Sequence, residues 1–149
     1  MSELKKLAHP ATEPERPLLS GIVTADLYGS LNLEATFKSQ RIDGNYGHYK
    51  ESIYVNAFSH IDGVDHILFF IPTNLTIGRH EIAGTDFVVS DTRFGYWKPE
   101  AGFLFLESIV PGDYHGQFEL YREVPVGGPD DPSRLVRIVN GKFHFEFAP

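Results

Sequence analysis

The chain has 149 residues, of which 42% are hydrophobic and 13% aromatic, enough for one packed core and too few for two ordinary domains. Its net charge of −7 argues against nucleic-acid and membrane partners, because duplexes and anionic lipids recruit clustered lysine and arginine. Cysteine is absent, which excludes disulfides, thiolate metal sites and cysteine nucleophiles.

The N-terminal segment, MSELKKLAHPATEPERP, is rich in proline and charge and buries too little apolar surface to offset the entropy of ordering it. We therefore expect a disordered tail over residues 1–17 and one domain over residues 18–149. The segment lacks the apolar stretch of a secretory signal, and no run approaches the roughly 20 apolar residues that cross a bilayer. These features predict a soluble, cytoplasmic protein.

From Leu18 onward, β-branched and aromatic residues alternate with polar ones between turn-forming residues, and no window has a helical stripe. The candidate strands are residues 21–27, 31–38, 52–59, 66–72, 78–82, 86–90, 102–109, 114–123 and 135–147. This spacing predicts an all-β, single-domain antiparallel β-sandwich of about eight or nine strands. A calycin-like β-barrel is the alternative, because the alternation alone does not separate the two.

The last candidate strand changes its apolar parity partway. Val136 and Ile138 share one face, whereas the three phenylalanines after Asn140-Gly141 have the opposite parity. A one-residue β-bulge with Gly141 in the left-handed conformation would return both sets to the same face. A tight hairpin at Asn-Gly is the competing interpretation. We prefer the bulge, because the preceding strand offers matching apolar partners.

The order of these C-terminal segments resembles a known group of proteins. The strand HGQFELY precedes a polar loop and the strand VRIVNGKFHFEF, and IPTNLTIGRHEI lies upstream. This arrangement, a G-x-F strand before a V-x-I-x-N-G-x-F strand, is similar to small bacterial β-sandwich proteins of uncharacterised function. The resemblance covers the C-terminal half; it implies the fold and no activity.

The segment SHIDGVDHI, residues 59–67, is the first candidate for chemistry. It offers imidazole and carboxylate ligands that suit zinc or a similar ion. The four residues are His60, Asp62, Asp65 and His66. Asp62-Gly63 between two apolar runs is also an ordinary hairpin turn, and we favour the turn. We therefore predict no metal site, with this set as the weak alternative, and no cofactor.

No nucleophile elbow, phosphate loop, dinucleotide fingerprint or zincin motif occurs, so we assign no catalytic residue. Four more histidines, His48, His80, His115 and His144, are scattered along the chain, and the sequence does not say which of them meet. The acidic pair in GGPDDPS lacks the spacing of a calcium loop, which favours a solvated loop.

Two segments, RIDGNYGHYKE and DTRFGYWKPE, combine flat rings with polar side chains, the materials of sugar or small-ligand recognition. The candidate ligand-binding residues are Tyr46, His48, Tyr49, Arg93, Tyr96 and Trp97. We expect Tyr96 and Trp97 to be at least partly exposed. The competing interpretation is that these rings cap the core.

We therefore predict a non-enzymatic binding or interaction module, which recognises a carbohydrate or other small polar ligand through aromatic loops. The alternatives are a small hydrolase or isomerase that uses histidine and carboxylate, and a structural subunit of a larger assembly. Residues 66–72 and 102–109 are apolar on both faces; if these strands were neighbours, their outer residues would form a large patch. We expect a homo-oligomer or a protein partner to cover it.

Overall fold

The computed structural model describes residues 15–29, 33–47, 52–60, 63–82, 87–92, 95–124 and 134–149. These residues form eleven β-strands, all paired antiparallel, and no helix. The strands are β1 (Arg16–Gly29), β2 (Leu33–Lys38), β3 (Arg41–Gly47), β4 (Ser52–Phe58), β5 (Val64–Pro72), β6 (Gly78–Glu81), β7 (Phe87–Asp91), β8 (Gly95–Trp97), β9 (Ala101–Val110), β10 (Asp113–Val124) and β11 (Arg134–Phe147). The prediction of an all-β antiparallel chain is confirmed, with more strands than the eight or nine expected.

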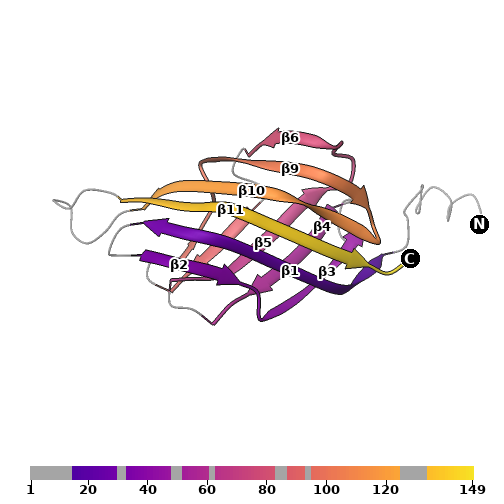
Figure 1. The fold of residues 1–149 in the computed structure, drawn as a ribbon, viewed down its shortest axis with the longest axis horizontal. Coiled ribbons are helices and arrows are strands. Elements are labelled where there is room, and N and C mark those ends of the chain that lie inside the picture. Colours follow the sequence, from indigo (N-terminus) through magenta and orange to yellow (C-terminus); the bar gives the residue numbers. More distant parts are fainter. Residues whose placement is uncertain are drawn as a thin grey trace, which may run out of the picture.

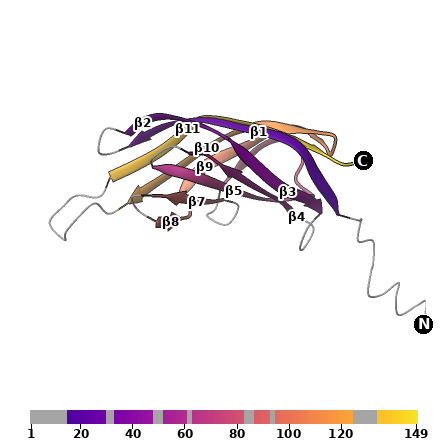
Figure 2. The same cartoon turned by 90° about the horizontal axis from the view of Figure 1, so that it is seen from below.

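One continuous sheet contains these strands in the order β6-β9-β10-β11-β1-β3-β4-β5-β7-β8, and β2 also pairs with β1. The sheet curls into a half-barrel, so that β9, β10, β11 and β1 lie across β4 and β5 (Figures 1 and 2). β1 belongs to both halves. Its first residues, Arg16 and Pro17, pair with β3, whereas its remaining length pairs with β11 and β2.

The core lies between the two halves of the curled sheet and is rich in phenylalanine. Phe69 of β5 is fully buried, and its ring centroid lies 5.2 Å from that of Phe118, 5.4 Å from that of Phe143 and 5.3 Å from that of Phe145. These three rings belong to β10 and β11 in the opposite half. Since each buried phenylalanine contributes about 1.5–3 kcal/mol, this cluster holds the halves together.

The bulge expected in the last strand is present, and β11 runs unbroken through it. The register of β10 against β11 shifts between Phe118 and Leu120, and both apolar sets of β11 face the core. The expected conformation was wrong in one respect: Asn140, not Gly141, has the positive φ, of 52°. Gly141 is needed for space instead, because a Cβ there would lie 2.6 Å from the carbonyl oxygen of Phe118.

Two strands, β3 and β8, were not predicted, and β1 starts earlier than predicted. β3 has the sequence RIDGNYG, and its Asp, Gly and Asn residues are more typical of a turn than of a strand. Gly44 lets β3 approach β4, because a Cβ there would lie 2.1 Å from the carbonyl oxygen of Tyr54. β8 has only three residues. β1 begins at Arg16, so residues 16 and 17 are part of the sheet rather than of a tail; residues 1–14 lie outside the described part.

The two strands that are apolar on both faces, β5 and β9, lie in different halves and do not pair, so they form no joint patch. On β9 the core receives Leu104 and Leu106, and on the outer face the guanidinium carbon of Arg79 lies 4.3 Å from the ring centroid of Phe103. The neighbouring Phe105 is 38% exposed. None of the described segments forms a helix that could cross a bilayer.

Candidate metal-binding site

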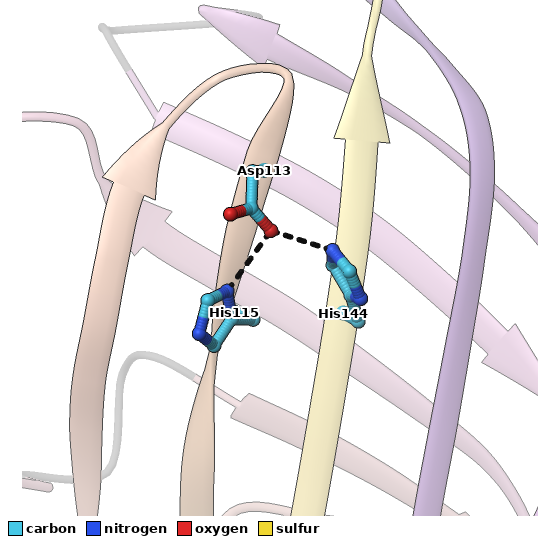
Figure 3. Close-up of side chains that lie close together, drawn as sticks. All are labelled: Asp113, His115 and His144. Atoms are coloured by element: carbon cyan, nitrogen blue, oxygen red, sulfur yellow. Dashed lines mark hydrogen bonds and ion pairs between the residues drawn. The ribbon is translucent and has the colours of Figure 1, made fainter.

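The start of β10 and the end of β11 place three polar side chains together on the outer face of the sheet. Asp113 and His115 are two residues apart on β10, so strand alternation puts them on one face while Tyr114 between them points into the core. His144 of β11 is the direct cross-strand partner of His115. All three side chains meet at one point (Figure 3).

Both histidines contact the same carboxylate oxygen. His144 Nε2 lies 2.7 Å from Asp113 Oδ1, and His115 Nδ1 lies 3.1 Å from that same atom. Because an ionised carboxylate only accepts hydrogen bonds, each of these nitrogens is the N–H donor. The candidate ligand atoms of the three residues lie within 4.8 Å of one another, the only such group among the residues with described coordinates.

The charge of the cluster is set by these hydrogen bonds. The hydrogen bond from His115, with a further one from His144, holds the pKa of the Asp113 carboxyl below its ordinary value. Asp113 is therefore ionised at neutral pH. The cluster is open to solvent, since the side chains of Asp113 and His144 are 55% and 57% exposed. The carboxylate is therefore in the form that a metal ion requires, and a bound ion would displace the protons through which the two imidazoles hydrogen-bond to it.

The backbone beneath the cluster is firmly held. Tyr114 is buried, and its ring packs against those of Phe143 and Phe147, with centroids 6.2 and 6.4 Å away. The hydroxyl of Ser108 on β9 donates a hydrogen bond to the backbone carbonyl oxygen of Asp113. The three side chains of the cluster therefore project from paired strands rather than from a loop.

Two shallow hollows meet at His144, which lines both of them. One, of about 360 Å³, extends over β9 and β10 and is also lined by His115, Glu107, Gln117 and Lys142. The other, of about 230 Å³, extends over β1 and is lined by Ser20, Gly21, Ile22 and Glu146. Ligands that approach the cluster therefore reach it from the open face of the sheet.

The ligand spacing suits a small divalent ion. With bonds of about 2.0–2.1 Å to nitrogen or oxygen, the ligand atoms of tetrahedral zinc lie about 3.3 Å apart. The nitrogen–oxygen distances of 2.7 and 3.1 Å would have to open by about 0.6 and 0.2 Å to admit the ion. Asp113, His115 and His144 would hold it, with at least one position left for water or another ligand.

The histidines of SHIDGVDHI have other surroundings. β4 ends at Phe58 and β5 begins at Val64 within this segment, the two strands pair as the turn interpretation predicts, and His60 is exposed. His66 Nε2 lies 2.8 Å from Asn56 Oδ1, and its ring stacks on Phe58 at a centroid distance of 4.3 Å. Burial lowers the pKa of His66. Asp62 lies outside the described residues, so the absence of a metal site here stays a prediction, with the four-residue set as its weak alternative.

The predicted ligand-binding residues are only partly described. Tyr46 packs its ring on Phe147 at a centroid distance of 5.5 Å, and β3, which carries it, is separated from β8 by three strands. The expected exposure is right for Tyr96, at 77%, and wrong for Trp97, at 6%, because Trp97 caps the core. The remaining members, His48, Tyr49 and Arg93, lie outside the described residues, as does the acidic pair Asp130 and Asp131.

The Asp113–His115–His144 cluster was missed from sequence, although two signals of it are present. Asp-x-His within a strand places both side chains on one face. The bulge fixes which residue of β11 lies opposite: counting back from the Phe118–Gly141 pair, His115 meets His144. The count requires the register across the bulge, which the sequence alone did not provide.

Comparison of the chain with protein-family models, with curated proteins and with solved structures found no match.

Proposed function

We propose that this protein is a non-enzymatic binding module that holds a divalent transition-metal ion at Asp113, His115 and His144. One observation carries the proposal: two imidazole nitrogens from two strands converge on a single carboxylate oxygen. In this proposal the two halves of the curled sheet act as the layers of a sandwich, and they present the ion on a rigid outer face.

The donor set favours a transition metal over calcium or magnesium. Imidazole nitrogen suits zinc, nickel, cobalt and copper, whereas calcium takes six to eight oxygen ligands and magnesium retains most of its waters. Two nitrogens and one oxygen match the first group. The open positions of the ion would face the two hollows at His144, one of which has Glu107, Gln117 and Lys142 in its lining, side chains that can bind the small polar ligand expected from the sequence.

The alternative, a hydrolase or isomerase that uses histidine and carboxylate, would employ the same three residues. A general base has to aim its free nitrogen at a substrate in a site from which water is displaced. Hydrogen bonds to Asp113 leave the second ring nitrogen of each histidine available, but the hollows beside them are shallow and open, so they do not displace water. These features support binding rather than proton transfer.

Calorimetry on chelator-treated protein tests the proposal. We expect one zinc, nickel or cobalt ion per chain, and no binding of calcium or magnesium. Replacement of a metal ligand should cost more than the roughly 10–100-fold that loss of a supporting residue costs. We expect this loss in His115→Ala and in His144→Ala, each checked for an unchanged circular dichroism spectrum.

His60→Ala is the matched control, because it removes an exposed histidine outside the cluster. It should leave the affinity unchanged. If His60→Ala and His66→Ala abolish binding while His144→Ala does not, the ion binds at SHIDGVDHI and the proposal is wrong. If no variant changes the affinity, binding is non-specific and the proposal also fails.

Association with a second copy or a protein partner remains part of the proposal. A metal ion with open positions on a flat, exposed face can take a further ligand from another molecule. Light scattering of the protein with and without zinc tests this. A monomeric mass in both conditions would restrict the module to small ligands.

A further inference from the structure

A third hollow lies at the edge of the sheet, away from the residues around His144. It has a volume of about 300 Å³ and is lined by Val88, Tyr96, Trp97, Lys98 and Arg122. These residues come from β7, from β8 and the residue after it, and from β10. β8 is the terminal strand of the sheet, so the hollow opens where the two curled halves part.

Trp97 carries an unused hydrogen-bond donor at this place. Its side chain is 6% exposed, and its indole Nε1 is buried with no hydrogen-bond partner in the described structure. Buried donors are almost always paired in folded proteins, and an unpaired one calls for a missing acceptor. Because Trp97 lines the hollow, an occupant of the hollow is the natural source of that acceptor.

Two cations line the same hollow of an otherwise acidic protein. Arg122 is held in place, since its Nη1 donates to the carbonyl oxygen of Lys98 at 2.7 Å and its Nε lies 4.0 Å from Glu100 Oε1. Glu100 does not line the hollow, and its Oε1 accepts the backbone N–H of Glu123 at 3.1 Å. The charged lining is therefore positive, and it favours an anion.

The remaining lining is flat and apolar. Tyr96 is 77% exposed, the largest exposure among the large hydrophobic residues described, and it stands beside Val88. An exposed aromatic ring next to fixed polar groups is the usual platform on which sugars and aromatic ligands stack.

We propose that this hollow binds a small carboxylic acid that carries a ring with an apolar face, either a sugar acid or an aromatic acid. The carboxylate pairs with Arg122 and Lys98, the ring stacks on Tyr96, and an oxygen of the ligand accepts the hydrogen bond of Trp97 Nε1. The hollow shares no residue with the metal cluster, so a test of ligand binding here does not depend on whether the protein binds a metal ion.

Trp97 is the only tryptophan of the chain, so the tryptophan fluorescence of the protein comes from a residue that lines the hollow. We would titrate glucuronate and benzoate at constant ionic strength and follow the fluorescence of Trp97. Glucose, a ring without a carboxylate, and acetate, a carboxylate without a ring, are the controls. We expect saturable change with at least one ring acid and none with either control.

Variants of the lining residues test whether the fluorescence change comes from binding in this hollow. Arg122→Gln should weaken the binding about tenfold or more, because it removes a charged hydrogen-bond partner. Trp97→Phe removes the donor and keeps a ring, and its weaker binding is measured by calorimetry. If Arg122→Gln does not fold, Lys98→Gln and Tyr96→Ala, which change exposed side chains, replace it.

Saturation by glucuronate alone supports a sugar acid, and saturation by benzoate alone supports an aromatic acid. The proposal is overturned if neither acid gives a saturable change. It is also overturned if acetate acts as strongly as the ring acids, or if the folded variants keep the wild-type affinity.

Discussion

His115 and His144 are direct cross-strand partners, with ring centroids 5.3 Å apart, and the bulge at Asn140 makes them so. On one side of the bulge Leu120 pairs with Ile138, and on the other side Phe118 pairs with Gly141, one residue out of step. Without the inserted residue, His144 would stand opposite Tyr114, whose side chain points into the core. The proposed site thus depends on an irregularity four residues away.

Zinc affinity should fall as the solution is acidified from about pH 7.5 to about pH 5.5, because protons and zinc compete for the same imidazole nitrogens. Calorimetry at several pH values measures the slope. Asp113→Asn provides the comparison: it should bind more weakly at every pH, since it lacks the anionic ligand, and retain the slope. An affinity that does not change with pH would show that the histidines are not ligands.

Asn140 should tolerate glycine better than valine. Its φ of 52° is open to glycine, whereas a β-branched residue is strained there by about 1–2 kcal/mol. Both substitutions also lose the hydrogen bond from Asn140 Nδ2 to Asp26 Oδ2, so the loss of this bond cancels when the two variants are compared. In urea unfolding, the free energy of unfolding of Asn140→Val should therefore be about 1–2 kcal/mol lower than that of Asn140→Gly. Equal stabilities would mean that the bulge conformation is unimportant.

His66 should make the fold sensitive to mild acid. The pKa of His66 in the folded protein is lowered from the ordinary value of 6.5, and burial is the main cause of this shift. Below pH 6.5 the unfolded chain therefore binds a proton that the folded chain does not, and the free energy of unfolding decreases as the pH falls. Above that pH this contribution is fully present.

The measurement compares urea unfolding of the wild type and of His66→Gln at about pH 7.5 and about pH 5.5. The wild type should lose more stability on acidification than the variant does. The same loss in both proteins would assign the effect to other groups, such as Asp113, whose pKa is also lowered but whose contribution disappears only in stronger acid.

Gly44→Ala should destabilise the fold by about 1–3 kcal/mol, the typical cost of overpacking. The added Cβ would lie 2.1 Å from the carbonyl oxygen of Tyr54, so β3 and β4 would have to separate. Gly112→Ala is the matched control, because a Cβ there meets no atom within 4 Å. Thermal unfolding measures how far each variant lowers the Tm relative to the wild type. If both lose the same stability, the close approach of β3 is not a constraint.

Local alternation was enough to predict most strands, and the parity change in β11 was enough to predict its bulge. Both signals are contained in a few neighbouring residues, such as Val136, Ile138 and Phe143. β3 was not predicted, because Gly44 allows the close contact with β4 and, as a glycine, adds no apolar side chain to the alternating pattern by which strands are recognised.

The candidate sites were harder to predict, because they depend on distant pairings. His115 and His144 come from different strands, and their meeting depends on the register of the whole β10–β11 pair. Trp97 was predicted to be exposed because its neighbours are polar and aromatic. Its burial depends on how the sheet curls over its edge strand, which local sequence does not describe.

The pairing of β1 with β11 has a consequence for synthesis on the ribosome. Leu18 lies opposite Phe147, so strands from the two ends of the described chain are neighbours. β3, β4, β5 and β7 pair in their order along the chain and can assemble as they emerge, whereas most of β1 waits for β11, which is synthesised after all the other described strands. Until then one edge of β1 stays unpaired, and it is the place where a nascent chain is most exposed to pairing with the wrong strand.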